Sequence, residues 1–210
     1  MVNGEIKIEG FKNLNSNPTV PFTTSLDERM PADYVGSYLT DKGFEMDRLL
    51  EDDFIKATKI LFQNDCYVSA LKLLLSAIDT TSFLEYGDIP GNFKKWVDKY
   101  CEIEKANITT EELWEFRNSL LHMTNAISRK VKRRAVKSLN FYVSHSDIEE
   151  RKSDGETKFF NLKTLISIVT KGLEEWGLSF NEDKEKFSLF VERYDLIISD
   201  SRYGKVYYGK

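Results

Sequence analysis

The segment between Asp65 and Gly87 constrains the fold of this chain more than any other part of the sequence. Its apolar residues recur at the three- to four-residue spacing of an α-helix, and two further leucines widen the apolar stripe. The stripe consists of Val68, Leu71, Leu75 and Ile78, with Leu73 and Leu74 beside it. A helix that is apolar around so much of its circumference has to be covered on several sides. We therefore expect it at the centre of a helical core or in the seam of a dimer.

The same helical period predicts helices on both sides of this segment. Before it, one helix is expected over residues 44–64, with the apolar residues Met46, Leu49, Leu50, Phe54, Ala57 and Leu61. After it, we expect a short helix over residues 93–101. A longer helix then begins at a capping box formed by Thr109 and Glu112 and carries Leu113, Phe116 and Leu120 on its apolar stripe. A helix over residues 162–176 and a last one capped by Asn181 close the body.

Two short segments depart from the helical period. Residues 137–144 alternate between apolar and polar side chains, as in a half-buried strand, and residues 157–160 follow as a returning strand after a charged loop. Together they predict a small β-hairpin. Residues 1–41 carry three of the four prolines, which disfavours a helix there and indicates an extended arm or a strand plus loop.

These elements predict a mainly α fold. At 210 residues the chain is long enough for one sizeable core and hardly for two full domains. We expect an N-terminal arm over residues 1–41 and a helical core over residues 42–134. Residues 135–210 are expected to add the β-hairpin and two C-terminal helices to the same core.

The composition limits the partners and the compartment. With 30 Lys and Arg against 34 Asp and Glu, the net charge is −4, so any nucleic-acid-binding surface must be local. No run approaches 18 apolar residues, and the N-terminus has no apolar signal core. Cys66 and Cys101 lack the spacing of a metal site and are expected to be buried free thiols. We therefore expect a cytoplasmic protein with no membrane partner, no metal and no cofactor.

One phrase in the helix that begins near Thr109 carries candidate chemistry: Arg117-Asn118-Ser119-Leu120-Leu121-His122. In an ideal α-helix Asn118 and His122 share a face, and Arg117 lies roughly 140° around the axis from His122. The guanidinium fork matches phosphate oxygens, the imidazole moves protons near neutral pH, and the amide can orient the imidazole or donate to a developing phosphorane. This set suits attack of a ribose 2′-hydroxyl on the adjacent phosphate without a metal. A polar trio on a helix is also common as a solvated face.

The phrase Arg117-Asn118-x-x-x-His122, preceded by Trp114 and Phe116, resembles the signature of the HEPN superfamily. The order of elements is similar as well, since an apolar antiparallel helix pair precedes the motif helix. The resemblance implies a HEPN-like helical bundle and a metal-independent endoribonuclease of the kind found in toxin–antitoxin and other prokaryotic defence systems. In that family the arginine stabilises the phosphate, the histidine is the acid or base, and the polar residue orients them.

The resemblance also implies a homodimer with two motifs facing one cleft, and an antitoxin or regulatory protein as a possible partner. Thr124 stands where some members carry a tyrosine used in neutralisation by nucleotide transfer. A dimer is also expected independently from histidine scarcity, because in-line cleavage profits from a base and an acid and the motif helix offers His122 alone. The other histidine, His145, is best interpreted as a solvated loop residue.

Two features outside the phrase bear on the site: a basic run that follows it and an acidic residue, Asp79, on the most apolar helix. A basic run without acids follows the motif: Arg129, Lys130, Lys132, Arg133, Arg134 and Lys137. It predicts either a guide for the RNA backbone or a solvated helix end stabilised by the helix dipole. Asp79 interrupts the most apolar helix, and Arg117 is a candidate partner for it. We favour the interpretation that Asp79 marks the point at which the helix reaches solvent, because acidic residues are mostly exposed.

Three functions therefore remain open. The first is a homodimeric endoribonuclease that cleaves single-stranded RNA with Arg117, Asn118 and His122. The second is a non-catalytic helical module that binds RNA or protein and uses the motif as a polar contact in a dimer seam. The third is a regulator whose basic run contacts DNA, which is weaker because no helix-turn-helix signature is present.

Overall fold

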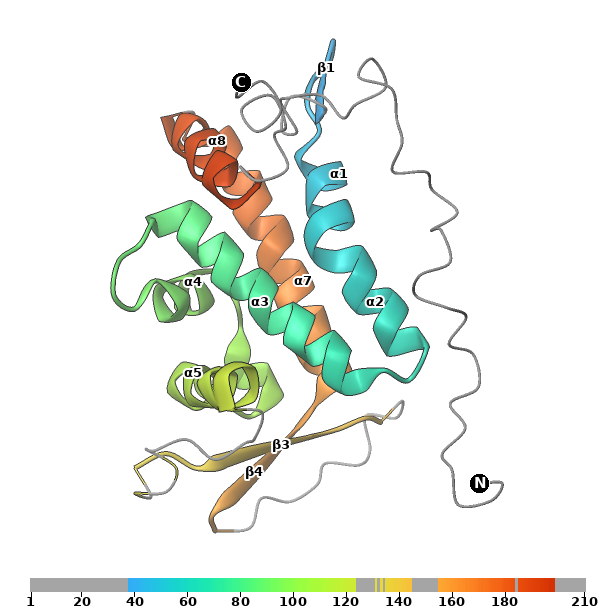
Figure 1. The fold of residues 1–210 in the computed structure, drawn as a ribbon, viewed down its shortest axis with the longest axis vertical. Coiled ribbons are helices and arrows are strands. Elements are labelled where there is room, and N and C mark those ends of the chain that lie inside the picture. The colour runs from blue at the N-terminus through green and yellow to red at the C-terminus, as the bar shows by residue number, and fades with distance from the viewer. Residues whose placement is uncertain are drawn as a thin grey trace, which may run out of the picture. The chain divides into compact units, whose positions relative to one another are not determined.

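The structure of this protein is a computed structural model. It describes residues 38–123, 131, 133, 135–144, 155–183 and 185–198. The N-terminal arm expected over residues 1–41 lies almost wholly outside these residues. The described body is mostly helical and carries two small two-stranded sheets, so the mainly α fold class is confirmed. Figure 1 shows the arrangement of the helices and the sheets.

The predicted helices and strands occur in the expected order along the chain, and short additional elements lie at residues 39–40, 43–44, 103–106 and 179–181. Two of the helices, η3 and η5, are π-helical and continue a preceding α-helix. The helices are α1 (Met46–Leu50), η3 (Glu51–Ile55), α2 (Lys56–Gln63), α3 (Tyr67–Tyr86), α4 (Asn92–Tyr100), η4 (Ile103–Ala106), α5 (Thr110–Asn118), η5 (Ser119–Met123), α7 (Leu162–Leu178), η6 (Ser179–Asn181) and α8 (Glu185–Ile198). The strands are β1 (Leu39–Thr40), β2 (Gly43–Phe44), β3 (Ser138–Tyr142) and β4 (Thr157–Asn161).

Helix α3 lies at the centre of the body, as its apolar pattern predicts. It contacts α2, α4, α7 and α8, and Leu71, Leu75 and Ile78 are fully buried. Val68 and Leu73 were expected in the apolar core but are 49% and 41% exposed, because the neighbouring helices leave one side of α3 uncovered. By length and composition α3 could also cross a membrane, and half of its most apolar stretch is buried. Because α3 contacts four other helices, its apolar composition is that of a core helix.

The helix predicted over residues 44–64 is present but is interrupted by the π-helical segment η3. A π-turn closes i→i+5 hydrogen bonds, so it inserts extra residues into the helical repeat and rotates the residues after it around the axis. Phe54 is buried as predicted. Beyond the π-turn the apolar stripe is displaced, since Ala57 is exposed and Thr58 is buried. The prediction for Ala57 was therefore wrong.

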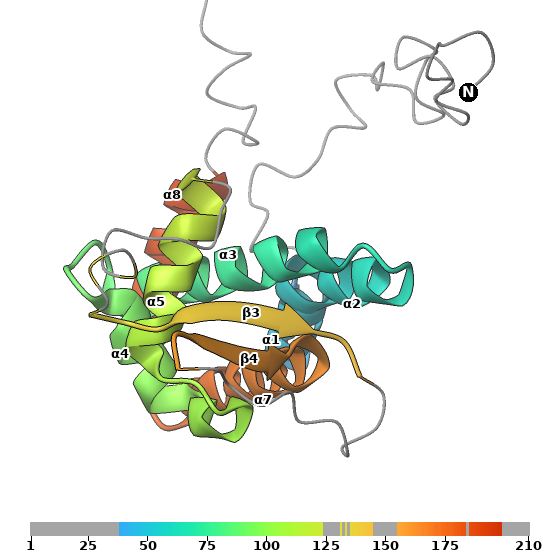
Figure 2. The same ribbon diagram turned by 90° about the horizontal axis from the view of Figure 1, so that it is seen from below.

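The predicted β-hairpin is wrong in its pairing. Both strands exist, but β3 pairs with β4 in parallel, with Leu139 opposite Lys158 and Phe141 opposite Phe160. A hairpin turn reverses the direction of the chain. A parallel pair instead needs a connection of about a dozen residues or more, which carries the chain back to the end of the sheet where the first strand began. Residues 143–156 are long enough for such a return. The sheet packs against α5 through β3 (Figure 2).

The last two helices, α7 and α8, close the body, with one correction to the sequence-based boundaries. Asn161 caps α7 by accepting the Lys163 backbone N–H at 3.0 Å. Asn181 does not cap α8, because it lies in η6; instead the Asp183 carboxylate accepts the Glu185 backbone N–H at 3.1 Å. A close approach fixes α7 on α4, because a Cβ at Gly172 would lie 2.8 Å from the Cys101 sulfur.

The two cysteines differ in their surroundings. Both are free thiols, but Cys101 is buried and Cys66 is exposed, so the expectation of burial fails for Cys66. Burial raises the pKa of the Cys101 thiol to about 12. This thiol is therefore neutral and packs as an apolar group.

Candidate active site on the motif helix

Helix α5, which carries the start of the motif, is fixed at its N-terminus by the predicted capping box. The Thr109 hydroxyl accepts the Glu112 backbone N–H at 3.2 Å, and the Glu112 carboxylate accepts the Thr109 N–H at 2.8 Å. The same carboxylate also receives Lys158 from β4, with an N–O distance of 2.9 Å. The helix start is thus held both by its own backbone and by the sheet.

The inner face of the motif helix changes at the α5–η5 junction. Leu113 and Phe116 are buried as predicted, and Phe116 meets the Phe160 ring of β4 edge-on. Leu120 was expected on the same stripe, but it is only half-buried, and Ser119 is fully buried in its place. The Ser119 hydroxyl satisfies its hydrogen bond by donating to the Glu115 carbonyl at 2.9 Å. The π-turn rotates the stripe here as it does at η3.

Arg117 lies at the centre of a compact polar group. Its Nε donates to Asp79 Oδ2 at 2.7 Å, and its Nη2 lies 2.6 Å from the same oxygen. Its Nη1 donates to Asn118 Oδ1 at 2.8 Å. The guanidinium carbon lies 5.2 Å from the centroid of the Trp114 ring, within the range of a cation–π contact. An ion pair, an amide and an aromatic face therefore restrict the guanidinium from three directions.

The Asp79 interaction corrects the favoured interpretation of that residue. Asp79 does not simply end the apolar part of α3 in solvent; it pairs with Arg117 across 38 residues of sequence. The side chains are 25% and 16% exposed, so the pair sits at the rim of the core. The Asp79 carboxylate offsets the charge of the Arg117 guanidinium. The pair therefore orients Arg117 and adds little net positive charge to the site.

The motif continues through the π-helix η5. The estimate of roughly 140° between residues 117 and 122 assumed an ideal α-helix and is wrong here. The backbone between them is partly π-helical, and its wider turn brings residues five apart closer around the axis. The backbone of His122 belongs to η5, while its side chain lies outside what the structure describes. Single π-turns inside α-helices are frequent at functional sites.

The structure describes only two residues of the predicted basic run. Arg133 lies in an exposed turn, and Lys137 is exposed immediately before β3. Arg129, Lys130, Lys132 and Arg134 lie outside the described residues, as do Thr124 and His145. Within the described part of the chain no group of three or more His, Cys, Asp or Glu side chains is arranged to hold a metal ion.

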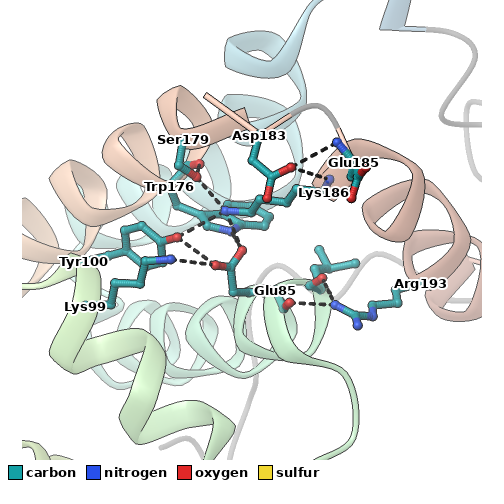
Figure 3. Close-up of polar contacts among 10 residues, drawn as sticks. Glu85, Lys99, Tyr100, Trp176, Ser179, Asp183, Glu185, Lys186 and Arg193 are labelled. Atoms are coloured by element: carbon teal, nitrogen blue, oxygen red, sulfur yellow. Dashed lines mark hydrogen bonds and ion pairs between the residues drawn. The ribbon is translucent and has the colours of Figure 1, made fainter. Parts of the chain in front are cut away.

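A second polar cluster, which the sequence did not indicate, lies at the C-terminal end of α3 (Figure 3). The Glu85 carboxylate accepts from Lys99 at 3.0 Å, Tyr100 at 2.8 Å and Trp176 Nε1 at 2.9 Å, and pairs with Lys186 at 2.5 Å. Burial opposes ionisation of Glu85, but the hydrogen bonds from these four groups outweigh it and lower its pKa.

This cluster is a structural junction. Its residues come from α3, α4, α7 and α8, so one carboxylate ties the ends of four helices together. Lys186 also donates to Ser179 and Tyr100 and lies 4.5 Å from the centroid of the Phe180 ring. A carboxylate so fully occupied is suited to holding helices and has no lone pair directed at a substrate.

Comparisons with known proteins add no assignment. No protein-family model matches the chain, and neither curated proteins nor solved structures gave a match.

Proposed function

We propose that this protein is a metal-independent endoribonuclease of the HEPN type that cleaves single-stranded RNA as a cytoplasmic homodimer. The observation that carries the proposal is the fixed guanidinium of Arg117, held by Asp79, Asn118 and Trp114 at the start of the motif. A restrained, partly exposed arginine can present its fork to a phosphate at little entropic cost. The resemblance of Arg117-Asn118-x-x-x-His122 to the HEPN signature supplies the reaction.

The reaction is an in-line displacement at phosphorus. The ribose 2′-oxygen attacks the neighbouring phosphorus, the bond to the 5′-oxygen breaks, and a 2′,3′-cyclic phosphate and a 5′-hydroxyl result. One imidazole accepts the 2′-hydroxyl proton and another protonates the leaving oxygen. Arg117 stabilises the charge on the phosphorane, and Asn118, whose oxygen is engaged by Arg117, acts on the RNA through its amide donors.

A homodimer supplies the two imidazoles that this scheme needs. Each chain contributes one His122, and a twofold axis would place two motif helices at one cleft. An antitoxin or regulatory protein that covers this cleft would control such an enzyme, in keeping with the defence systems in which the family occurs.

The decisive experiment uses a 5′-labelled single-stranded RNA with parent protein and the His122→Ala variant, with and without EDTA. We expect cleavage by the parent in both conditions, a 2′,3′-cyclic phosphate at the product end, and a loss of about 10²- to 10⁴-fold in the variant. Mixing parent with His122→Ala subunits tests the shared cleft: because each cleft needs an imidazole from both chains, mixed dimers should not cleave, and activity should fall with the square of the parent fraction. Equal degradation by parent and variant would show that the activity belongs to a contaminant.

One observation favours the non-catalytic alternative, a helical module that binds RNA or protein. Arg117 is already neutralised by Asp79, as expected for a polar contact that merely packs. The His122→Ala variant distinguishes the two functions. If the protein is a binding module, the variant keeps the binding affinity and the dimer mass of the parent, and the parent itself does not cleave RNA.

A further inference from the structure

The two faces of the β3–β4 sheet have different chemistry. The inner face is turned toward α5, since Lys158 pairs with Glu112 and Phe160 packs on Phe116, while Leu139 is buried beside them. Side chains alternate along each strand, so the opposite, outer face consists of Ser138, Asn140 and Tyr142 of β3 and Thr157, Phe159 and Asn161 of β4. Figure 2 looks onto the side of the sheet that is turned away from the helices.

This outer sheet face carries groups that recognise nucleobases. Asn140 is exposed, while Tyr142 and Phe159 are half-buried, so neither aromatic residue is fully enclosed by the body. Asn140 lies opposite Phe159 in the register, and Tyr142 lies two residues further along β3. Two strand rises and one strand spacing separate Phe159 from Tyr142, which places their Cα atoms about 8 Å apart. Aromatic planes at such spacings stack successive bases of single-stranded RNA, and an amide can bond their edges.

Charge and chain order connect this face to the motif. The basic run of six positive charges without an acid leads from the motif helix to the first residue of β3, and its last member, Lys137, is exposed beside Ser138. Among the described strands, β3 pairs with β4 alone, and its other edge has no described strand beside it. Lys137 therefore adds a positive charge that can attract a polyanion next to the first residue of β3.

We propose that the outer sheet face of β3–β4 is a stacking platform for single-stranded RNA, with Tyr142 and Phe159 as the stacking residues and Asn140 as a base-edge contact. The platform holds the strand a few nucleotides from the scissile phosphate. The inference rests on the proposed function, because it names how that same site takes its substrate.

The test measures RNA affinity apart from cleavage. Fluorescence anisotropy with a labelled 12-nucleotide single-stranded RNA compares His122→Ala with the same protein carrying Tyr142→Ala, Phe159→Leu or both. We expect the Kd to rise roughly tenfold or more for each aromatic ring removed, whereas Tyr142→Phe keeps the plane and stays within about twofold. Phe62→Leu is the matched control, because Phe62 is a half-buried aromatic residue on α2 that packs on Tyr67. Thermal unfolding by circular dichroism identifies variants that fail to fold.

The outcomes separate this inference from the proposed function. Unchanged RNA affinity in folded Tyr142→Ala and Phe159→Leu overturns the platform, even if the parent cleaves RNA. Affinity that depends on both rings, with no cleavage by the parent, supports the platform and overturns the ribonuclease. A drop in molecular mass by light scattering at unchanged RNA affinity would make this face a contact between copies and would also overturn the platform.

Discussion

Two polar clusters at different places along α3 contain similar groups in different surroundings. Glu85 is 7% exposed and is held by residues of α4, α7 and α8 together. Asp79 pairs with Arg117 of α5, and the two side chains keep 25% and 16% of their surface exposed. The carboxylate at the centre of the first cluster is enclosed by the fold, whereas the second cluster lies at its rim.

This difference separates a group that holds the fold from one that can meet a ligand. An enclosed charge with several fixed partners is costly to disturb, because removing one partner leaves another charge buried and unpaired. An ion pair at the rim is partly solvated. When one partner is removed, water solvates the remaining charge, so the free energy of unfolding changes little. Changes at Glu85 should therefore appear in stability, and changes at Arg117 and Asp79 in RNA chemistry.

The largest expected effect is on stability, from Glu85→Ala. The substitution leaves the nearly enclosed Lys186 without its carboxylate, and we expect the free energy of unfolding to fall by about 3–5 kcal/mol. Urea denaturation followed by circular dichroism measures it. Glu182→Ala is the control, since this exposed acid lies four residues before Lys186 and should change stability by less than about 0.5 kcal/mol. Similar losses in both variants would contradict the structural role of Glu85.

Acidification should remove the same contribution gradually. Glu85 has a pKa below its ordinary value of 4.5 in the folded protein, despite burial. A carboxyl with a depressed folded pKa binds protons more weakly when folded, so its contribution is complete above the unfolded pKa and is lost as pH falls through the folded value. Urea midpoints measured from pH 7 to pH 3 should fall more steeply below about 4.5 in the parent than in Glu85→Gln. Parallel curves for the two proteins would rule out this linkage.

Arg117→Lys should affect cleavage with little effect on the fold. Lysine keeps the charge near Asp79 but cannot present a planar fork to two phosphate oxygens. We expect kcat for a single-stranded RNA to fall about a hundredfold, in the range of losing one transition-state donor. The control is Arg48→Lys, at an exposed ion pair on α1, which should leave kcat unchanged. Full activity in Arg117→Lys would assign the motif to packing.

Asp79→Asn sharpens the comparison further, because it removes the charge that neutralises Arg117 while keeping an acceptor oxygen. The guanidinium becomes more available to phosphate but less firmly oriented, so we expect kcat to fall about tenfold with KM unchanged or lower. Asp88→Asn, at an exposed position after α3, provides the matched control. A higher KM with unchanged kcat would mean that Asp79 does not position Arg117.

Local signals let the sequence predict much of this fold. The capping box of Thr109 and Glu112 depends on groups three residues apart, and the structure contains both of its hydrogen bonds. Apolar periodicity predicted α3 and α7 because each buries a stripe against several neighbours. Within the site, the contact between Arg117 and Asn118 needs only adjacent residues.

The features that the sequence missed depend on tertiary structure. Asp79 meets Arg117 through the packing of two helices, so base rates alone favoured a solvent-exposed position for it. The π-turns at η3 and η5 displace the apolar stripe, and no residue type in either segment indicates them. The strand pattern of residues 138–142 and 157–161 is the same for parallel and antiparallel pairing. Glu85 gave no signal because its four partners come from distant segments.

The smallest expected effect returns to the start of the motif helix. Thr109→Ala removes the hydroxyl that caps α5, and we expect a loss of about 1 kcal/mol in the free energy of unfolding. Thr109→Ser keeps the hydroxyl and should restore most of it. Because Lys158 still holds Glu112 to the sheet, the position of Arg117 should persist and RNA cleavage should change by less than about twofold. A larger loss of cleavage than of stability would show that the helix start, as well as the Asp79–Arg117 pair, sets the geometry of the site.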